Sequence, residues 1–226
     1  MANREKEWYR KEKVAESYDE KRFEEGGKVL DIKEKSILLD LIDPKGKKIL
    51  DIATGTGRFA ELMAGEGGDV VGLDASREML DRGKADYVLG DAFELPFIRK
   101  GFDTTVSMRF LHLVSPENIE DLVNEVARVT KGRFVFESLH PMSLRILYQW
   151  ALPQNSRMYS KSFLKEKFEE MEVVSGVKYH QGLCIPYGFY QCLPFDLAEE
   201  LCELDDKIVD RHEWTASTVY WELFFD

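Results

Sequence analysis

Residues 48–57 have the sequence KILDIATGTG. Its first half is a short apolar run, which predicts a buried strand, and its second half carries two glycines, which predict a tight turn. A helix is predicted directly after the turn, over residues 58–64. A strand, a glycine-rich turn and a helix in this order indicate the first unit of an α/β fold.

The same alternation continues along the chain. Further strands are predicted at residues 70–74, 87–91, 102–108 and 133–137, with helices from Ser76, a suitable N-cap, to Gly83 and from Pro116 to Val129. Five strands that alternate with helices predict a parallel sheet wrapped by helices on both faces.

Both flanks of this core carry their own patterns. Apolar residues at helical spacing predict helices over 3–24 and 31–42, with Gly26-Gly27 stopping the first. Beyond His140, residues 141–160 show no clean period, after which helices are predicted at 161–171 and 196–209 and strands at 173–185 and 215–225.

These elements predict a doubly wound, mostly parallel, Rossmann-like α/β fold. The sheet is expected to have seven strands with an antiparallel last strand, an N-terminal helical cap and a C-terminal insertion or lid. We expect a single domain over 1–226, with N-terminal helices at 1–44, a core at 45–140 and an insertion with the last strands at 141–226.

Composition narrows the class of protein. The formal net charge is −11 and the sequence pI is about 5.0, which disfavours polyanionic partners such as nucleic acids. Three widely spaced cysteines provide neither a disulfide framework nor a cysteine-rich zinc site, and we expect no metal site. No apolar run approaches the length of a membrane span, and the first residues lack the apolar stretch of a secretory signal, so we expect a cytoplasmic protein.

Acidic side chains follow successive predicted strands. Gly55 and Gly57 follow the first strand, Asp74 ends the second about 20 residues later, and Asp91 ends the third. Ligands of such sheets bind outside the carboxyl ends of the strands, and an aspartate at this spacing accepts hydrogen bonds from ribose hydroxyls. The combination predicts a binding site for a nucleoside-type cofactor.

Two cofactors fit the glycine spacing. Gly55-x-Gly57-x-x-Ala60 followed by Asp74 also satisfies the dinucleotide fingerprint, so an NAD-dependent oxidoreductase is one alternative. Asp51 and Asp91 disfavour it, because carboxylates suit a cation and an adenine amino group better than a pyrophosphate. S-adenosylmethionine, which carries a sulfonium, an ammonium and a ribose but no phosphate, fits the acids better.

At this point the sequence resembles a known family. Residues 48–64 are similar to the first motif of class I S-adenosylmethionine-dependent methyltransferases, and residues 70–75, 90–97 (GDAFELPF) and 102–114 resemble the next three motifs in order. The similarity is strongest to the small-molecule group that includes quinone-biosynthesis methyltransferases, whose N-terminal helix resembles VAESYD at 14–19. The resemblance covers roughly residues 10–140.

The resemblance implies a role for particular residues. Asp51, Ala53 and Gly55 would line the methionine part of the cofactor, Asp74 would hold its ribose, and Asp91 and Ala92 would lie at its adenine edge. Arg109 with Phe110 would flank the cofactor and Tyr18 would close over it, and the further cofactor-binding residues would be Thr54, Gly57 and Ala75. Ala53 departs from the glycine found in many members, and we expect a slightly altered backbone approach there. The product of the cofactor would be S-adenosylhomocysteine.

Candidates for a general base are His112, His140 and Tyr18, because the two histidines are predicted at the carboxyl ends of strands. Aromatic residues are concentrated between 148 and 221, which suggests a lid over a small apolar or aromatic acceptor. Besides the oxidoreductase, the alternatives are a non-catalytic S-adenosylmethionine-binding domain and an RNA methyltransferase. We expect a monomer or homodimer.

Overall fold

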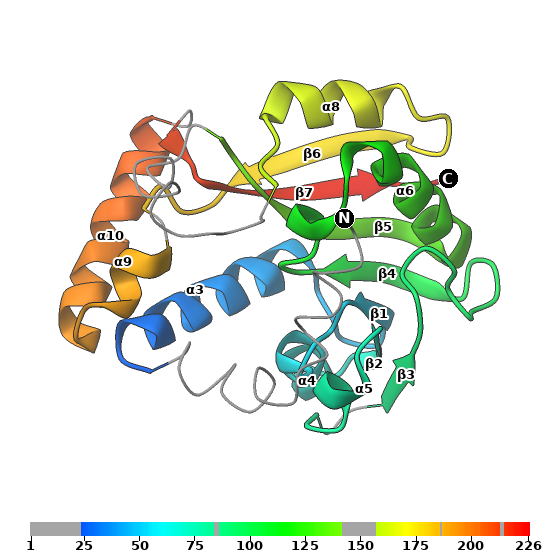
Figure 1. Ribbon diagram of the computed structural model, residues 1–226, viewed down its shortest axis with the longest axis horizontal. Coiled ribbons are helices and arrows are strands. Elements are labelled where there is room, and N and C mark those ends of the chain that lie inside the picture. The colour runs from blue at the N-terminus through cyan, green and yellow to red at the C-terminus, as the bar shows by residue number, and fades with distance from the viewer. Residues whose placement is uncertain (1–23, 84–85, 142–156, 186, 213–214) are drawn as a thin grey trace.

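The computed structural model describes residues 24–83, 86–141, 157–185, 187–212 and 215–226 (Figure 1). The predicted helix over 3–24 lies almost entirely outside these ranges. Among the helices in these ranges, none has the length and apolar character that a membrane crossing requires.

One sheet organises the described chain, with strand order β3-β2-β1-β4-β5-β7-β6. The strands are β1 (Lys48–Ile52), β2 (Asp69–Asp74), β3 (Asp86–Leu89), β4 (Phe102–Ser107), β5 (Thr130–Leu139), β6 (Gly176–Gln181) and β7 (Thr218–Phe224). β7 is antiparallel to both of its neighbours, and the other adjacent strands pair in parallel. The predicted seven-stranded, mostly parallel sheet with an antiparallel last strand is confirmed.

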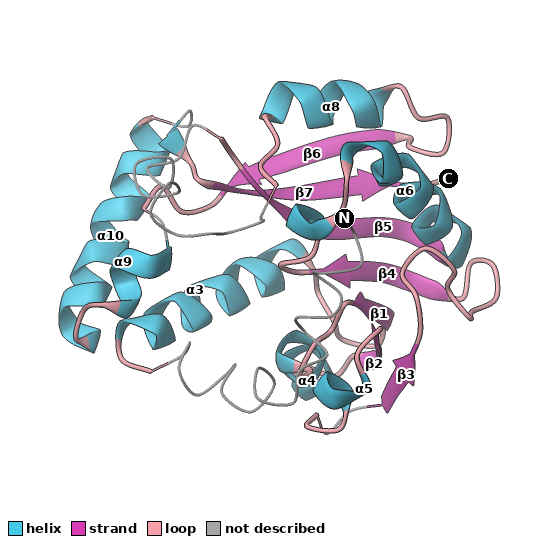
Figure 2. Cartoon of the chain, in the orientation of Figure 1, coloured by secondary structure: helices cyan, strands magenta, loops and turns pink. Residues whose placement is uncertain are grey.

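Helices cover both faces of this sheet (Figure 2). They are α3 (Gly26–Leu41), α4 (Arg58–Gly65), α5 (Arg77–Leu80), α6 (Ile119–Val129), α8 (Lys161–Glu169), α9 (Tyr187–Gln191) and α10 (Phe195–Arg211), with single 3-10 turns η1 (Leu111–Leu113) and η2 (Pro116–Asn118). In Figure 1 the arrows of β4 and β6 point toward the side on which α9 and α10 lie, and the arrow of β7 points away.

Two apolar layers hold the helices to the sheet. On one face, α6 and α8 pack against β5 and β7 through residues that include Leu122, Phe168 and Trp221. On the other face, α3 and α4 pack against the sheet through residues that include Leu38 and Tyr220. Because helices bury both faces of the sheet, a ligand can approach only at the ends of the strands.

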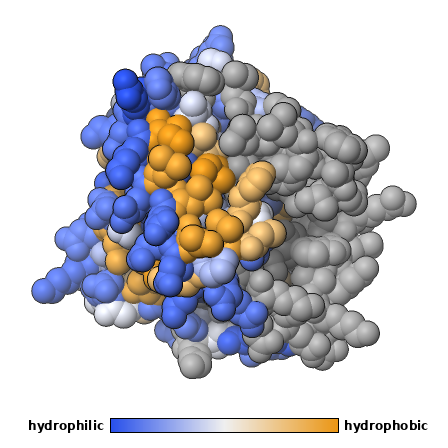
Figure 3. Space-filling view, turned by 90° about the vertical axis from the view of Figure 1, so that its left-hand side faces the viewer, coloured by the Kyte–Doolittle hydropathy of each residue, from blue (hydrophilic) through white to orange (hydrophobic). Residues whose placement is uncertain are grey.

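A helical unit near the C-terminus packs against α3. Leu30 of α3, Tyr190 of α9 and Ala198 of α10 are each fully buried in one cluster. The carboxylate of Asp205 on α10 accepts the hydroxyl of Tyr190 at 2.6 Å and the backbone N–H of Cys184 at 2.9 Å. Figure 3 shows an apolar band bordered by hydrophilic residues on this side of the molecule.

Several predicted boundaries were wrong for identifiable reasons. The helix expected to start at residue 31 begins at Gly26, where a Cβ would lie 2.0 Å from the Tyr190 carbonyl oxygen, so glycine permits the contact between α3 and α9. The helix expected over 76–83 ends at Leu80, although Ser76 is its N-cap as predicted and accepts from the N–H of Met79.

The C-terminal part differs more. The strand expected over 173–185 is confined to β6, because the N–H of Val174 bonds to the Met171 carbonyl in a turn before it. The short helix α9 was not predicted from the sequence. β5 is longer than predicted at both ends.

Candidate active site

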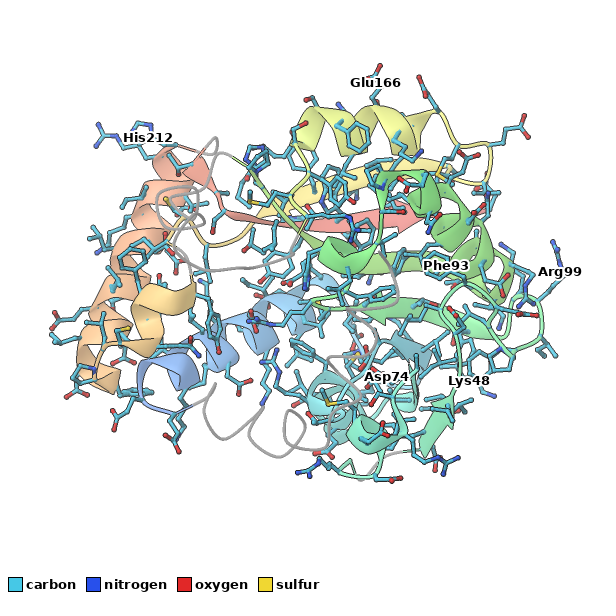
Figure 4. All side chains as sticks on the ribbon, in the orientation of Figure 1. Lys48, Asp74, Phe93, Arg99, Glu166 and His212 are labelled. Carbon is cyan, nitrogen blue, oxygen red and sulfur yellow. The ribbon has the colours of Figure 1, made fainter. Side chains whose placement is uncertain are left out.

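A cavity of about 310 Å³ opens at the carboxyl ends of β1, β2, β3 and β4. β1 and β2 contribute residues at their ends, β3 and β4 contribute residues that follow them, and Leu113 of η1 and Arg157 also line the cavity. Figure 4 labels two lining residues, Asp74 at the end of β2 and Phe93 in the loop after β3. The location agrees with the rule that ligands of open α/β sheets bind outside the carboxyl ends of the strands.

The turn after β1 is built on left-handed backbone. Ala53 has φ 56°, Gly55 φ 60° and Gly57 φ 87°, and the N–H of Gly57 bonds to the Thr54 carbonyl at 3.0 Å. A Cβ on Gly55 would meet nothing within 4 Å, so the backbone there is open to a ligand. A Cβ on Gly57 would lie 1.7 Å from the Tyr87 hydroxyl, so this position requires glycine.

Asp74 is held in place from two sides. Its Oδ2 accepts the N–H of Gly55 and its Oδ1 accepts the N–H of Ser76, each at 2.9 Å. Burial raises the pKa of Asp74 above its usual value, although the backbone N–H groups of Ser76, Gly55 and Ala75 oppose the rise. Both oxygens retain a lone pair, so the fixed carboxylate can accept two more hydrogen bonds from a diol.

The other two strand-end acids also have local partners. Asp51, 1% exposed, accepts the Thr54 hydroxyl at 2.6 Å, and Asp91 accepts the N–H of Phe93 at 3.1 Å. Burial raises the pKa of Asp51 to about 7; the Thr54 bond opposes this rise and the charge of Asp74 adds to it. Within the described ranges, no group of three or more His, Cys, Asp and Glu side chains is arranged to hold a metal ion.

An ion-pair network joins α3 to the cavity wall. Arg58, at the start of α4, bonds to Asp31 and also to Glu34, the latter at 2.9 Å, while Arg109 after β4 bonds to the second oxygen of Glu34. Arg109 has left-handed backbone, φ 59°, and its guanidinium lies 4.7 Å from the ring centre of Tyr187. Both arginines are therefore compensated by carboxylates before any ligand binds.

The structure brings most of the predicted cofactor residues to one cavity. Those that line it are Asp51, Ala53, Thr54, Gly55, Asp74, Ala75, Asp91, Ala92 and Arg109. Gly57 is the N-cap of α4 and is not among the lining residues.

The described candidate bases lie outside this lining. Neither His112 nor His140 lines the cavity, and Tyr18 lies outside the described residues. His140 is buried, and burial followed by the charge of Lys161 lowers its pKa. Of the described aromatic residues predicted to form a lid, Tyr159, Tyr190, Tyr220 and Trp221 are core residues, and Phe189 is half exposed.

Sequence reasoning missed three buried polar residues near the cavity. They are Glu34 on α3, Glu137 on β5 and Tyr220 on β7, which are 4%, 5% and 0% exposed. Glu137 had a signal, since it follows the apolar run RFVF at 133–136 in a central strand, where a charge is rarely buried without a function. Glu34 and Tyr220 are typical of an amphipathic helix and an alternating strand, so their patterns gave no signal.

Comparison with known proteins assigns the family. A family profile described as "Methyltransferase domain" matches residues 49–133. The demethylmenaquinone methyltransferase of Paenarthrobacter aurescens is 41% identical over 116 residues, covering 47% of this chain and 45% of that protein. The chain belongs to the class I S-adenosylmethionine-dependent methyltransferase family.

Two further relatives extend the similarity beyond the matched core. An uncharacterized protein of Methanocaldococcus jannaschii is 31% identical over 179 residues, covering 76% of this chain and 66% of that protein. The structure of a SAM-dependent methyltransferase from Archaeoglobus fulgidus has a TM-score of 0.65 at 21% identity, covering 92% and 97% of the two chains, and therefore shares the methyltransferase fold. The chain spans about half the length of the first curated relatives that it matches.

Proposed function

We propose that this methyltransferase-family protein transfers the methyl group of S-adenosylmethionine to a small-molecule acceptor. The observation that carries the proposal is that Asp51, Asp74 and Asp91 all line one cavity of about 310 Å³. Three carboxylates favour a ligand with a cationic end, a ribose and an adenine, and disfavour a pyrophosphate.

Each acid suits one part of this cofactor. Asp74, fixed by two backbone donors, would accept the ribose hydroxyls, and Asp91 with Ala92 would lie along the adenine. Asp51 would face the ammonium and sulfonium charges, and the open backbone at Gly55 allows close approach. When bound, the cofactor supplies an electrophilic methyl group whose departure leaves a neutral thioether.

The protein's own contribution is to hold reactants in line and exclude water. Phe93, Phe110 and Leu113 give the cavity an apolar wall, which lowers the local dielectric and suits an apolar or aromatic acceptor. The similarity to demethylmenaquinone methyltransferases supports an acceptor of this type. The alternative of an NAD-dependent enzyme is disfavoured further because Arg58, the basic residue nearest to the turn, is already paired with Asp31 and Glu34.

Calorimetry with S-adenosylmethionine, S-adenosylhomocysteine and NAD tests the cofactor. We expect micromolar binding of the first two, and a loss of about 1–3 kcal/mol in Asp74→Ala, the usual cost of a lost charged hydrogen bond. Asp69→Ala is the matched control, because Asp69 begins the same strand at its opposite, exposed end and its substitution should leave affinity unchanged. Binding of NAD in place of S-adenosylmethionine would overturn the proposal.

A further inference from the structure

Two polar residues missed by the sequence analysis face each other across the sheet. Glu137 of β5 and Tyr220 of β7 are direct partners in the antiparallel register, so both side chains leave the same face of the sheet. Directly opposed residues of such pairs have Cβ atoms about 4.5–5.5 Å apart. The two side chains therefore form a cross-strand pair.

The hydroxyl of this pair lacks a hydrogen bond. Tyr220 is fully buried, and its hydroxyl has no partner among the described residues. A buried hydroxyl without a partner is unfavourable, so most are paired with protein or a ligand. Tyr220 therefore offers a donor and acceptor that folding alone does not use.

Charged groups from several elements act on this hydroxyl. They are Glu34 from α3, Arg58 from α4, Arg109 after β4 and Glu137 itself. From β6, His180 is the other cross-strand partner of Tyr220, and its ring bonds to Glu222 at 3.0 Å. Burial raises the pKa of Tyr220 well above its usual value, with Glu34 and Glu137 adding to the rise, so the phenol stays protonated at neutral pH.

The pair adjoins the cavity on the side away from Asp91. The sheet order is β3, β2, β1, β4, β5, β7, so the strand ends run from Asp91 through Asp74 and Asp51 to Met108 and then to this pair. Ser107 pairs with Phe136, which sets Met108 level with Glu137. Met108 lines the cavity and also packs in the apolar cluster that contains Tyr220.

Met108 therefore links the lining of the cavity to the cluster that contains Tyr220. A methionine side chain is unbranched and adapts its rotamer at small cost, so a bound acceptor can reach the pair past it. If adenine lies by Asp91 and ribose by Asp74, the acceptor approaches from the β5–β7 side of the sheet.

We propose that Tyr220 and Glu137 bind the nucleophilic group of the methyl acceptor, and that this group is a hydroxyl or amine that carries a proton. This inference rests on the proposed methyl transfer and names the acceptor chemistry. The Tyr220 hydroxyl donates to the acceptor oxygen or nitrogen, and the Glu137 carboxylate accepts its proton.

The step balances without a further reactant. The acceptor oxygen or nitrogen forms a bond to the methyl carbon while the carbon–sulfur bond breaks and its electron pair stays on sulfur. The proton that the acceptor loses passes to Glu137, which returns it to water after product release.

Ligand-observed NMR on the S-adenosylhomocysteine complex tests the pair. The probes are a set of small phenols and hydroquinones and a second set of aromatic and aliphatic amines. We expect members of one set to bind, to lose at least tenfold in affinity in Glu137→Gln, and to lose about fivefold in Tyr220→Phe. The set that binds distinguishes an O–H from an N–H acceptor.

A matched control separates binding from folding. Glu222 is also 5% exposed and lies on the same sheet face two residues along β7, but bonds to Arg133 and His180. Glu222→Gln should leave probe affinity unchanged, and melting temperatures are recorded for all three variants.

The experiment distinguishes a wrong assignment of Tyr220 and Glu137 from a wrong proposed function. If no probe binds the wild-type complex, or probes bind both pair variants as tightly as wild type, the assignment of the pair is overturned. If wild type does not bind S-adenosylhomocysteine at all, the proposed function itself is overturned. With a probe that is methylated, kcat in Glu137→Gln should fall at least 100-fold while Glu137→Asp restores part of it.

Discussion

The two ends of the open sheet edge differ in how their polar contacts are made. Around the proposed cofactor cavity, each acid has a bond within three residues of itself, from Thr54 to Asp51, Ser76 to Asp74 and Phe93 to Asp91. Asp74 also accepts the N–H of Gly55, 19 residues away. On the proposed acceptor side, Glu137 and Tyr220 are brought together by the pairing of β5 with β7. The acids of the cofactor end are thus positioned mainly by local sequence, and the acceptor end depends on correct packing of the C-terminal elements.

Removal of the Asp205 carboxylate should destabilise the C-terminal elements without affecting the cofactor end. This fully buried carboxylate bonds to the Tyr190 hydroxyl and the backbone N–H groups of Cys184 and Ile185. Asp205→Ala leaves these donors unsatisfied, so we expect a loss of about 3 kcal/mol in the free energy of unfolding. Urea denaturation measures it, and hydrogen exchange should accelerate in 183–211 but not in 48–80.

Tyr190→Phe is the graded control for Asp205. It removes one donor and leaves the carboxylate with its two backbone partners, so we expect a loss of about 1 kcal/mol. S-adenosylhomocysteine affinity should stay within about twofold of wild type in both variants, since neither residue lines the cavity. A large loss of affinity would show that the two ends are coupled.

The affinity for S-adenosylmethionine should depend on pH through the ionisation of Asp51. Its pKa is about 7, and only the carboxylate attracts a cation. S-adenosylmethionine affinity should therefore rise with pH, by about tenfold between pH 6 and pH 8, because the ionised fraction rises by that factor around a pKa of 7. Calorimetry in buffers of different ionisation enthalpy should detect proton release at pH 6.

Asp51→Asn removes the titrating group, so its affinity should be lower and flat over this range. S-adenosylhomocysteine keeps the ammonium but lacks the sulfonium, which predicts a smaller dependence in wild type. An equally steep slope in Asp51→Asn would assign the titration to another group.

The difference between local and distant contacts also explains which features could be predicted from the sequence. The turn at Gly55 and the acids at Asp74 and Asp91 were predicted because strand ends, glycines and spacing are local patterns. The mostly parallel seven-stranded sheet and its antiparallel last strand were also predicted, since five βα units favour a parallel sheet, whereas the strand order came only from the structure.

Features made by distant packing were not predicted. Glu34 meets Arg109 75 residues away, and Glu137 meets Tyr220 only because β7 pairs beside β5. α9 is five residues long and contains a glycine, so neither helix propensity nor periodicity marks it. Such contacts exist only in the folded chain, where burial changes the chemistry of residues that look ordinary in sequence.

Ala53, in the turn after β1, gives a smaller expected effect. Its φ of 56° lies in the left-handed region, which costs an L-residue about 1 kcal/mol. Ala53→Gly should therefore raise the free energy of unfolding by about 0.5–1 kcal/mol and leave cofactor affinity within about twofold. Ala60→Gly, in the interior of α4, is the same substitution in helical backbone and should lower stability by about 1 kcal/mol. Urea denaturation measures both changes in the free energy of unfolding. A gain in Ala53→Gly beside a loss in Ala60→Gly would establish that the backbone is strained at Ala53, and equal losses in the two variants would contradict it.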